Sequence, residues 1–186
     1  VLTRLFRRLG DDALPFYYQL RDDSDSDILA AISTTSADLR FLDVDMWAEN
    51  LVELSNHELP VVRRNLVPSL REYFETFPDD TRKLLPVMWQ DGDEVVRTRM
   101  RELLIKMSDI SSTQFGARIT DLNQHGCDLS ALWRLMDARR KGSSEAWKSW
   151  LSGEGEMPET IETMRHVSTM QAVSYTHLRA HETDSH

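Results

Sequence analysis

The sequence DGDEVVR (residues 91–97) joins a polar turn to the start of an amphipathic helix. Its last three residues, VVR, also occur at residues 61–63, which is 34 positions earlier. The apolar residues that follow keep the same spacing in both places, with Leu66 and Leu70 after the first copy and Met100 and Leu104 after the second. Such spacing places apolar side chains on one face of a helix. The stretch therefore predicts a helical repeat of about 34 residues.

A first helix precedes each of these second helices, and its apolar positions recur with the same period. The expected core triplets are Ala13, Tyr17 and Leu20; Trp47, Leu51 and Leu54; Thr81, Leu85 and Met88; and Phe115, Ile119 and Leu122. A polar turn and a second helix follow each triplet, although the first and fourth second helices fit the pattern more loosely. Strand signals are nearly absent. The sequence therefore predicts an all-α protein of about four antiparallel helix pairs.

Helix-capping residues support this division. Short oxygen-bearing side chains are expected to cap the first helices at Asp45, at Asp79 and at either Ser111 or Ser112, and the second helices at Asp93 and Asp128. Three prolines also fit: Pro60 should lie in a first turn, where it costs little, whereas Pro68 and Pro86 should kink their helices.

Residues 11–140 resemble short HEAT-like repeats, and the resemblance is most specific in the second and third copies. The Asp in the turn and the Val-Arg of the second helix, as in residues 91–97, carry it. It implies a right-handed α-solenoid in which the second helices line the concave face. It also implies that Asp91 and Arg97 form a structural pair between a turn and a helix. Such pairs orient their elements while adding little net stability.

Three segments are expected along the chain. Residues 1–142 hold the HEAT-like repeats, and residues 143–172 hold C-terminal helices that continue or cap the array. Within the second segment, a helix at 143–151 carries Trp147 and Trp150, and a loop follows at 152–158 before a further helix. Residues 173–186 resemble the translation of a sequencing adaptor, so we expect that they are not natural and that the chain is a fragment of a larger protein.

The composition excludes several classes of protein. The 186 residues include 22 Lys plus Arg and 31 Asp plus Glu, for a net charge of -9, which argues against a surface devoted to nucleic acid or anionic membrane. The single cysteine, Cys127, excludes an intramolecular disulfide framework and fits a reducing compartment. No apolar run approaches the roughly 20 residues that span a bilayer. We therefore expect a cytoplasmic protein with no membrane contact.

No catalytic or metal-binding residue is expected. The pair His57-Glu58 invites comparison with deoxyhypusine hydroxylase, a HEAT-like enzyme that binds two irons through several His-Glu pairs, but only one pair exists here. His125 lies two repeats from His57, roughly 20 Å away at ordinary helix spacing, too far to share a metal. Cys127 lacks the partners of a nucleophile. We expect no cofactor and no small-molecule substrate, and interpret all three side chains as turn residues.

The second helices carry more basic than acidic residues, although the whole chain is acidic. On a helical wheel, four arginines point away from the core, and they predict a mildly basic ridge along the inner surface: Arg64, Arg71, Arg101 and Arg134. We expect a non-catalytic scaffold whose ridge binds a protein or acidic peptide. Three alternatives stay open: a nucleic-acid module like the HEAT-like DNA glycosylases, a metalloenzyme or its regulatory subunit, and a merely solvated charged face.

Overall fold

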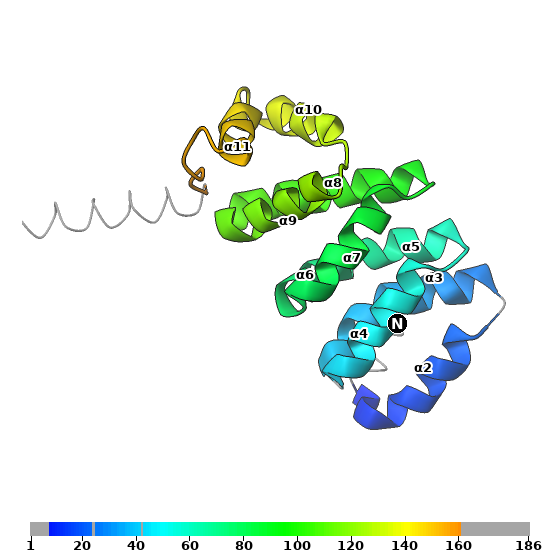
Figure 1. The fold of residues 1–186 in the computed structure, drawn as a ribbon. Helices are drawn as coiled ribbons and strands as arrows, with labels where there is room; N and C mark the ends of the chain where they lie inside the picture. The colour runs from blue at the N-terminus through cyan, green and yellow to red at the C-terminus, as the bar shows by residue number, and fades with distance from the viewer. Residues whose placement is uncertain (1–7, 24, 42, 161–186) are drawn as a thin grey trace, which may run out of the picture.

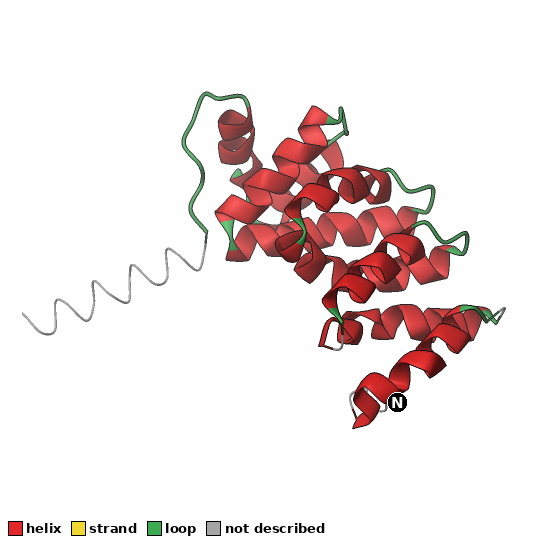
Figure 2. Ribbon diagram, turned by 60° about the horizontal axis from the view of Figure 1, so that its bottom comes forward, coloured by secondary structure: helices red, strands yellow, loops and turns green. Residues whose placement is uncertain are grey.

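The computed structural model describes residues 8–23, 25–41 and 43–160. Within these ranges every regular element is a helix (Figures 1 and 2), as the sequence predicts. The α-helices are α2 (Leu14–Arg21), α3 (Ser26–Thr35), α4 (Val44–Ser55), α5 (Pro60–Leu66), α6 (Leu70–Thr76), α7 (Pro78–Trp89), α8 (Glu94–Ile110), α9 (Ser112–Gln124), α10 (Ser130–Arg139) and α11 (Ser143–Leu151). Three short 3₁₀ helices accompany them: η1 (Gly10–Ala13), η2 (Ser36–Phe41) and η3 (Val67–Ser69).

The helices form two adjoining rows that can be followed in Figure 1. In the first row α4 contacts α7, α7 contacts α9, and α9 contacts α11. In the second row α3 contacts α5, α5 contacts α8, and α8 contacts α10. Helices that are neighbours in the chain also pack across the rows, as α2 does with α3 and α7 with α8. The hydrophobic core lies between the two rows.

The apolar positions identified by spacing form this core. All members of the four triplets in the first helices are buried except Leu20, which is partly exposed. On the second helices, Val62, Leu66, Val96, Met100 and Leu132 have no exposed surface at all. Because each buried aliphatic or aromatic side chain contributes about 1.5–3 kcal/mol of transfer free energy, this continuous core is the main source of stability.

Three of the five predicted caps fall where they were expected. The Asp93 side chain accepts the N–H groups of Val95 and Val96, and Ser111 caps α9. The Asp128 carboxylate accepts the N–H of Ser130 at 2.8 Å, at the start of α10.

The predictions for the other two caps are wrong by about one half-turn. Helix α4 is capped by Asp43, whose carboxylate accepts the N–H groups of Asp45 and Met46. Helix α7 begins at Pro78 with no side-chain cap, and Asp79 lies in its first turn. Both Asp45 and Asp79 therefore lie near the positive end of a helix dipole, where a carboxylate remains favourable.

Prolines shape the second copy in particular. Pro60 opens α5 in its first turn, and Pro68 lies in η3, which separates α5 from α6. A proline inside a helix removes one backbone donor, so the 3₁₀ segment is the expected response. Pro86 lies inside α7, which runs as one α-helix to Trp89.

Two hydrogen bonds between second-row helices are related by the predicted period of 34 residues. The Asn65 side chain donates to the main-chain carbonyl of Ala30 at 3.2 Å, and Arg99 donates to that of Arg64 at 2.6 Å. Donor and acceptor both move by 34 positions between the two bonds. In the first row, the Asn50 amide donates to the Tyr17 hydroxyl at 2.6 Å. These bonds fix the sliding of one helix along the next, which apolar contacts alone specify poorly.

Helix α11 closes the end of the described chain by packing on α9. The Trp147 ring lies 4.6 Å from the Phe115 ring in an edge-to-face arrangement. Gly116 permits a close approach, because a Cβ atom there would lie 2.9 Å from the Trp150 ring. A loop follows α11 from residue 152, as predicted. The helix expected beyond residue 158 falls mainly outside the described residues, and the adaptor-like segment 173–186 falls wholly outside them.

Candidate functional site

The turn between α7 and α8 is held to the preceding second helix by a bidentate ion pair. Arg63 on α5 donates from Nε to one Asp91 oxygen at 2.7 Å and from a terminal nitrogen to the other at 2.9 Å. Arg97, the partner expected from the sequence, contacts Asp91 only at its main-chain carbonyl and pairs its side chain with Glu94. The cause is geometric, because Arg63 reaches the Asp91 carboxylate from the neighbouring helix α5. Arg97 instead folds toward the start of its own helix, where it contacts the Asp91 carbonyl and Glu94.

The same turn contains a second ion pair, between Arg64 and Asp93. The Asp93 carboxylate accepts hydrogen bonds from Arg64 and from the main-chain N–H groups of Val96 and Val95. These bonds hold the pKa of Asp93 well below its usual range. Burial alone would raise the pKa of Asp91, but the Arg63 hydrogen bonds and the Asp93 N–H outweigh it and lower that pKa. Both carboxylates are therefore ionised at neutral pH and act as structural anchors.

Arg63 and Arg97 make equivalent contacts with the main chain. Arg63 donates to the carbonyl of His57, and Arg97 donates to that of Asp91, six residues back in each case. His57 and Asp91 are 34 positions apart, as Arg63 and Arg97 are. The two arginines therefore donate to the main-chain carbonyls of equivalent residues. Only the carboxylate of Asp91 is special to the third copy.

Three of the four arginines predicted to form the ridge have carboxylate partners within the chain. Arg64 pairs with Asp93, as described, and Arg71 lies 3.2 Å from Glu75 one turn later on α6. Arg101 lies 3.4 Å from Glu94, and its side chain is only 17% exposed. A partner for these three must therefore compete with an internal carboxylate.

The fourth arginine belongs to a group of cations that remain available. Exposed side chains on α10 and the turn after it have no ion pair with another described residue: Arg134, Arg139, Arg140 and Lys141. We call these four residues the α10 basic surface. Arg139, Arg140 and Lys141 were not among the site residues selected from the sequence, although the run of basic residues at 139–141 was a visible signal.

Arg101 and Arg134 both act electrostatically on Asp128, just before the start of α10. The Ser130 hydroxyl and main-chain N–H, and then Arg134 and Arg101, lower the pKa of Asp128. Arg64 and Arg71, in contrast, pair with Asp93 and Glu75.

Trp89, which is out of phase with the core stripe, is nevertheless buried. Its indole N–H donates to the carbonyl of Asp128 at 3.1 Å, and the Arg101 guanidinium lies 5.9 Å from the ring centre. The loop before α10 therefore covers a face of α7 that the helical period alone leaves to solvent. Its burial depends on the neighbouring copy, which the period of one helix does not describe.

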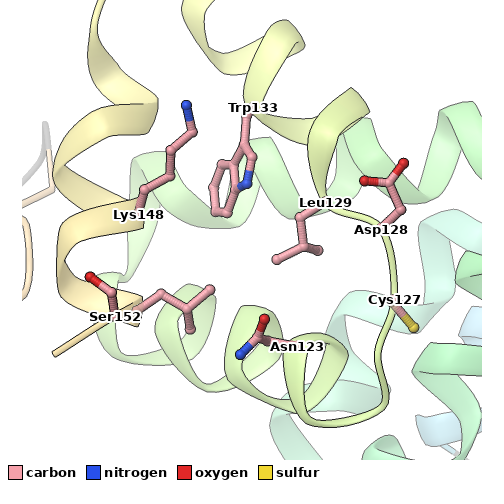
Figure 3. Close-up of a pocket in the computed structure, with 8 residues that line it drawn as sticks. Asn123, Cys127, Asp128, Leu129, Trp133, Lys148 and Ser152 are labelled. Carbon is pink, nitrogen blue, oxygen red and sulfur yellow. The ribbon is translucent and has the colours of Figure 1, made fainter.

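A pocket of about 390 Å³ opens between α9, α10 and α11 (Figure 3). Trp133 and Leu129 point into it from α10 and the residue before it, and Asn123 faces it from α9. Lys148 lies at its edge and pairs with Glu145 at 2.6 Å. Because about half of its lining is apolar, the pocket suits an apolar side chain of a partner. One of its lining residues, Trp133, directly precedes Arg134 in the chain.

The residues considered for chemistry have structural contacts. The Nδ1 atom of His57 accepts the N–H of Leu59 at 3.1 Å, and Nδ1 of His125 lies 2.7 Å from the carbonyl of Asp121. Cys127 is buried, with the Gln90 amide 3.2 Å from its sulfur, which points away from the pocket in Figure 3. Among residues 8–23, 25–41 and 43–160, no three His, Cys, Asp or Glu side chains gather as metal ligands would.

None of the helices in the described ranges combines the length and apolar character needed to cross a bilayer. Comparisons with protein-family models, with curated proteins and with solved structures each found no match.

Proposed function

We propose that the chain is a segment of a HEAT-like α-solenoid that serves as a non-catalytic scaffold for a partner protein. Supporting the repeat interpretation are the two rows of helices and the hydrogen bonds of Asn65 and Arg99, which are related by one period. A repeat array presents a long surface made of equivalent helices, and such surfaces characteristically bind extended segments of other proteins.

The ligand we propose is an acidic segment of the partner, bound along the second-row helices. The α10 basic surface is the single observation that carries this proposal, because its four cations are exposed and have no ion pair with a described residue. Arg64, Arg71 and Arg101 contribute to binding only if the ligand displaces their internal carboxylate partners. A guanidinium presents a fork that matches a carboxylate, which favours acidic side chains over neutral ones.

The pocket beside Trp133 gives this surface a second element of recognition. Charged contacts at an exposed surface steer association and set the register, but contribute little affinity alone. An apolar or aromatic side chain that enters a partly apolar pocket supplies the anchor that interfaces usually need. The preferred ligand is therefore an acidic segment with one apolar residue, in which the apolar residue occupies the pocket.

Charge reversal with a matched control tests the proposal. The variant Arg134→Glu/Arg139→Glu should lower affinity for a pool of acidic peptides at least tenfold at near-physiological salt, with the thermal midpoint unchanged. Lys83, an exposed lysine on first-row helix α7, provides the control Lys83→Glu, which should bind as the parent does. Equal losses in both variants would indicate general electrostatics, and unchanged binding in the double variant would refute the assignment. Tighter binding of duplex DNA than of any peptide would favour the nucleic-acid alternative.

A further inference from the structure

A cavity of about 240 Å³ lies between α8, the end of α10 and the start of α11. Two arginines of the α10 basic surface, Arg139 and Arg140, line it together with Ser143, the first residue of α11. Asp109 on α8 also lines it, but none of the ion pairs between described residues joins its carboxylate to either arginine. The cavity therefore holds a serine hydroxyl together with two guanidinium groups, which outnumber the one carboxylate.

The Ser143 hydroxyl is accessible, unlike that of its neighbour. Ser143 is partly exposed, and its oxygen neither forms a hydrogen bond with a described residue nor belongs to the buried polar atoms that lack a partner. The Ser144 side chain is fully buried, and its hydroxyl donates to the Asp137 carboxylate at 2.6 Å. Of these two adjacent serines, only Ser143 is therefore open to an enzyme.

Three basic residues precede Ser143 on an exposed turn. Arg139, Arg140 and Lys141 lie four, three and two positions before it, and residues 138–142 are all exposed. Gly142 has a φ of 77° in this turn, and the N–H of Ser143 donates to the carbonyl of Arg140 at 3.0 Å. Because protein kinases select acceptor serines partly by the charge of neighbouring residues, this pattern favours an arginine-directed kinase.

We propose that Ser143 is a phosphorylation site whose phosphate occupies the α10 basic surface and excludes the acidic ligand. In this reaction Oγ of Ser143 forms a bond to the γ-phosphorus of a nucleoside triphosphate bound to the kinase. The bond from that phosphorus to the β-phosphate oxygen breaks, the nucleoside diphosphate leaves, and the hydroxyl proton passes to a base of the kinase. The regulatory part of this inference rests on the proposed function, because it needs an acidic ligand at this surface, whereas the modification does not.

A phosphate at Ser143 supplies the kind of internal partner that other ridge arginines already have. Arg64 and Arg71 pair with carboxylates of the chain, whereas no described residue forms an ion pair with Arg139 or Arg140. A phosphoserine carries about −1.5 to −2 charges at neutral pH and three acceptor oxygens, so it can bind the guanidinium groups that share its cavity. An acidic ligand then finds these cations occupied and meets a like charge.

Incubation of the full chain with an arginine-directed kinase and ATP, followed by peptide mass spectrometry, tests the modification. The peptide that contains Ser143 should take up one phosphate, and the same peptide of Ser143→Ala should take up none. Ser26 is the matched control, because it is also exposed at the first position of a helix but lies between two aspartates, and it should stay unmodified. No phosphate at Ser143, under conditions that modify a basic model peptide, overturns the proposal.

Phosphoserine incorporated during synthesis at position 143, or at position 26 as the control, tests the pairing with the arginines. The second pKa of a phosphoserine is ordinarily about 6. In phosphorus NMR titrations this pKa should be lower at position 143 than at position 26 by about half a unit or more, because guanidinium groups favour the dianion. It should rise again in Arg139→Met/Arg140→Met, which removes both groups. Equal pKa values at the two positions, or no rise in the double variant, overturn the pairing.

Binding of the acidic peptide pool separates failure of this inference from failure of the proposed function. The chain with phosphoserine at position 143 should bind the peptides at least tenfold more weakly than the unmodified chain, and phosphoserine at position 26 should leave binding unchanged. Equal binding with and without the phosphate at position 143 refutes the regulatory role. If the unmodified chain binds no acidic peptide, the proposed function fails and the regulatory role fails with it, while the NMR titration still decides whether the phosphate pairs with the arginines.

Discussion

Removing Arg63 tests whether its bidentate pair with Asp91 holds α5 to the turn between α7 and α8. In Arg63→Ala, Asp91 loses two charge-assisted hydrogen bonds, and its carboxylate, only 7% exposed, keeps just the N–H of Asp93. The carbonyls of His57 and Glu58 lose a donor as well. Removing one partner of a buried ion pair costs about 3–5 kcal/mol. Because Asp91 keeps one hydrogen bond and the pair is partly exposed, we expect Arg63→Ala to cost about 3 kcal/mol.

Urea denaturation followed by circular dichroism measures this loss directly. For a domain of this size, about 3 kcal/mol corresponds to a fall of roughly 6–12 °C in thermal midpoint. The control is Arg71→Ala, which removes the more exposed pair with Glu75 on one helix and should cost only about 0.3–0.5 kcal/mol. Asp91→Ala and the double variant complete a cycle, with an expected coupling of about 1.5 kcal/mol or more.

Two results would refute this reasoning. A coupling below about 0.3 kcal/mol would mean that Arg63 and Asp91 act independently, whatever their geometry. A loss in Arg71→Ala as large as that in Arg63→Ala would mean that arginine stems, rather than the pair, provide the stability.

Three further predictions concern pH, the core and the end of the chain. The pKa of Asp91 in the folded protein lies below its unfolded value of about 3.9. The ion pair therefore contributes its full stabilisation above the unfolded pKa, and this contribution is lost as pH falls through the folded pKa. The stability difference between parent and Arg63→Ala should therefore shrink below about pH 4 in acid titrations, and a constant difference would contradict the assignment. Val96→Asp should cost several kcal/mol in urea denaturation, since Val96 is fully buried, whereas Val95→Asp on the exposed side should change stability by about 0.5 kcal/mol or less. Ending the chain at Ala172 should leave the thermal midpoint unchanged in calorimetry, and a drop of several degrees would show that residues 173–186 contribute to folding.

The core was predictable because burial within a helix follows from its own period. Trp47, Leu85 and Phe115 needed only the 3.6-residue turn and a repeat length to be placed, and all three are buried. Trp89 was not predictable in the same way. Its side chain is covered by the loop before α10, and the distance between α7 and that loop depends on packing between copies, which no local pattern records.

The site residues were less predictable because charges choose partners by distance. Asp91 has Arg63 and Arg97 on neighbouring second helices, and the sequence alone favours the nearer one in the chain. The structure pairs the carboxylate with Arg63, because the stacking of α5 on α8 brings that guanidinium to the turn. Likewise, a helical wheel exposes Arg64 without revealing that Asp93 on the next turn neutralises it.

The bonds from Asn65 and Arg99 to helix carbonyls have a consequence for how such a sequence can diverge. Each of these two bonds joins a side chain to a main-chain carbonyl about 34 residues earlier, at Ala30 and Arg64, although Arg99 also donates to the Asn65 side chain at 3.4 Å. The acceptor positions can therefore exchange alanine for arginine and keep the bond, because every residue carries the same carbonyl. The donor positions do not have this freedom, since only a side chain with an N–H of suitable reach will serve. Substitution should therefore accumulate quickly at the acceptor positions and slowly at the donor positions, so related sequences lose recognisable similarity there while the helices keep the same alignment with one another.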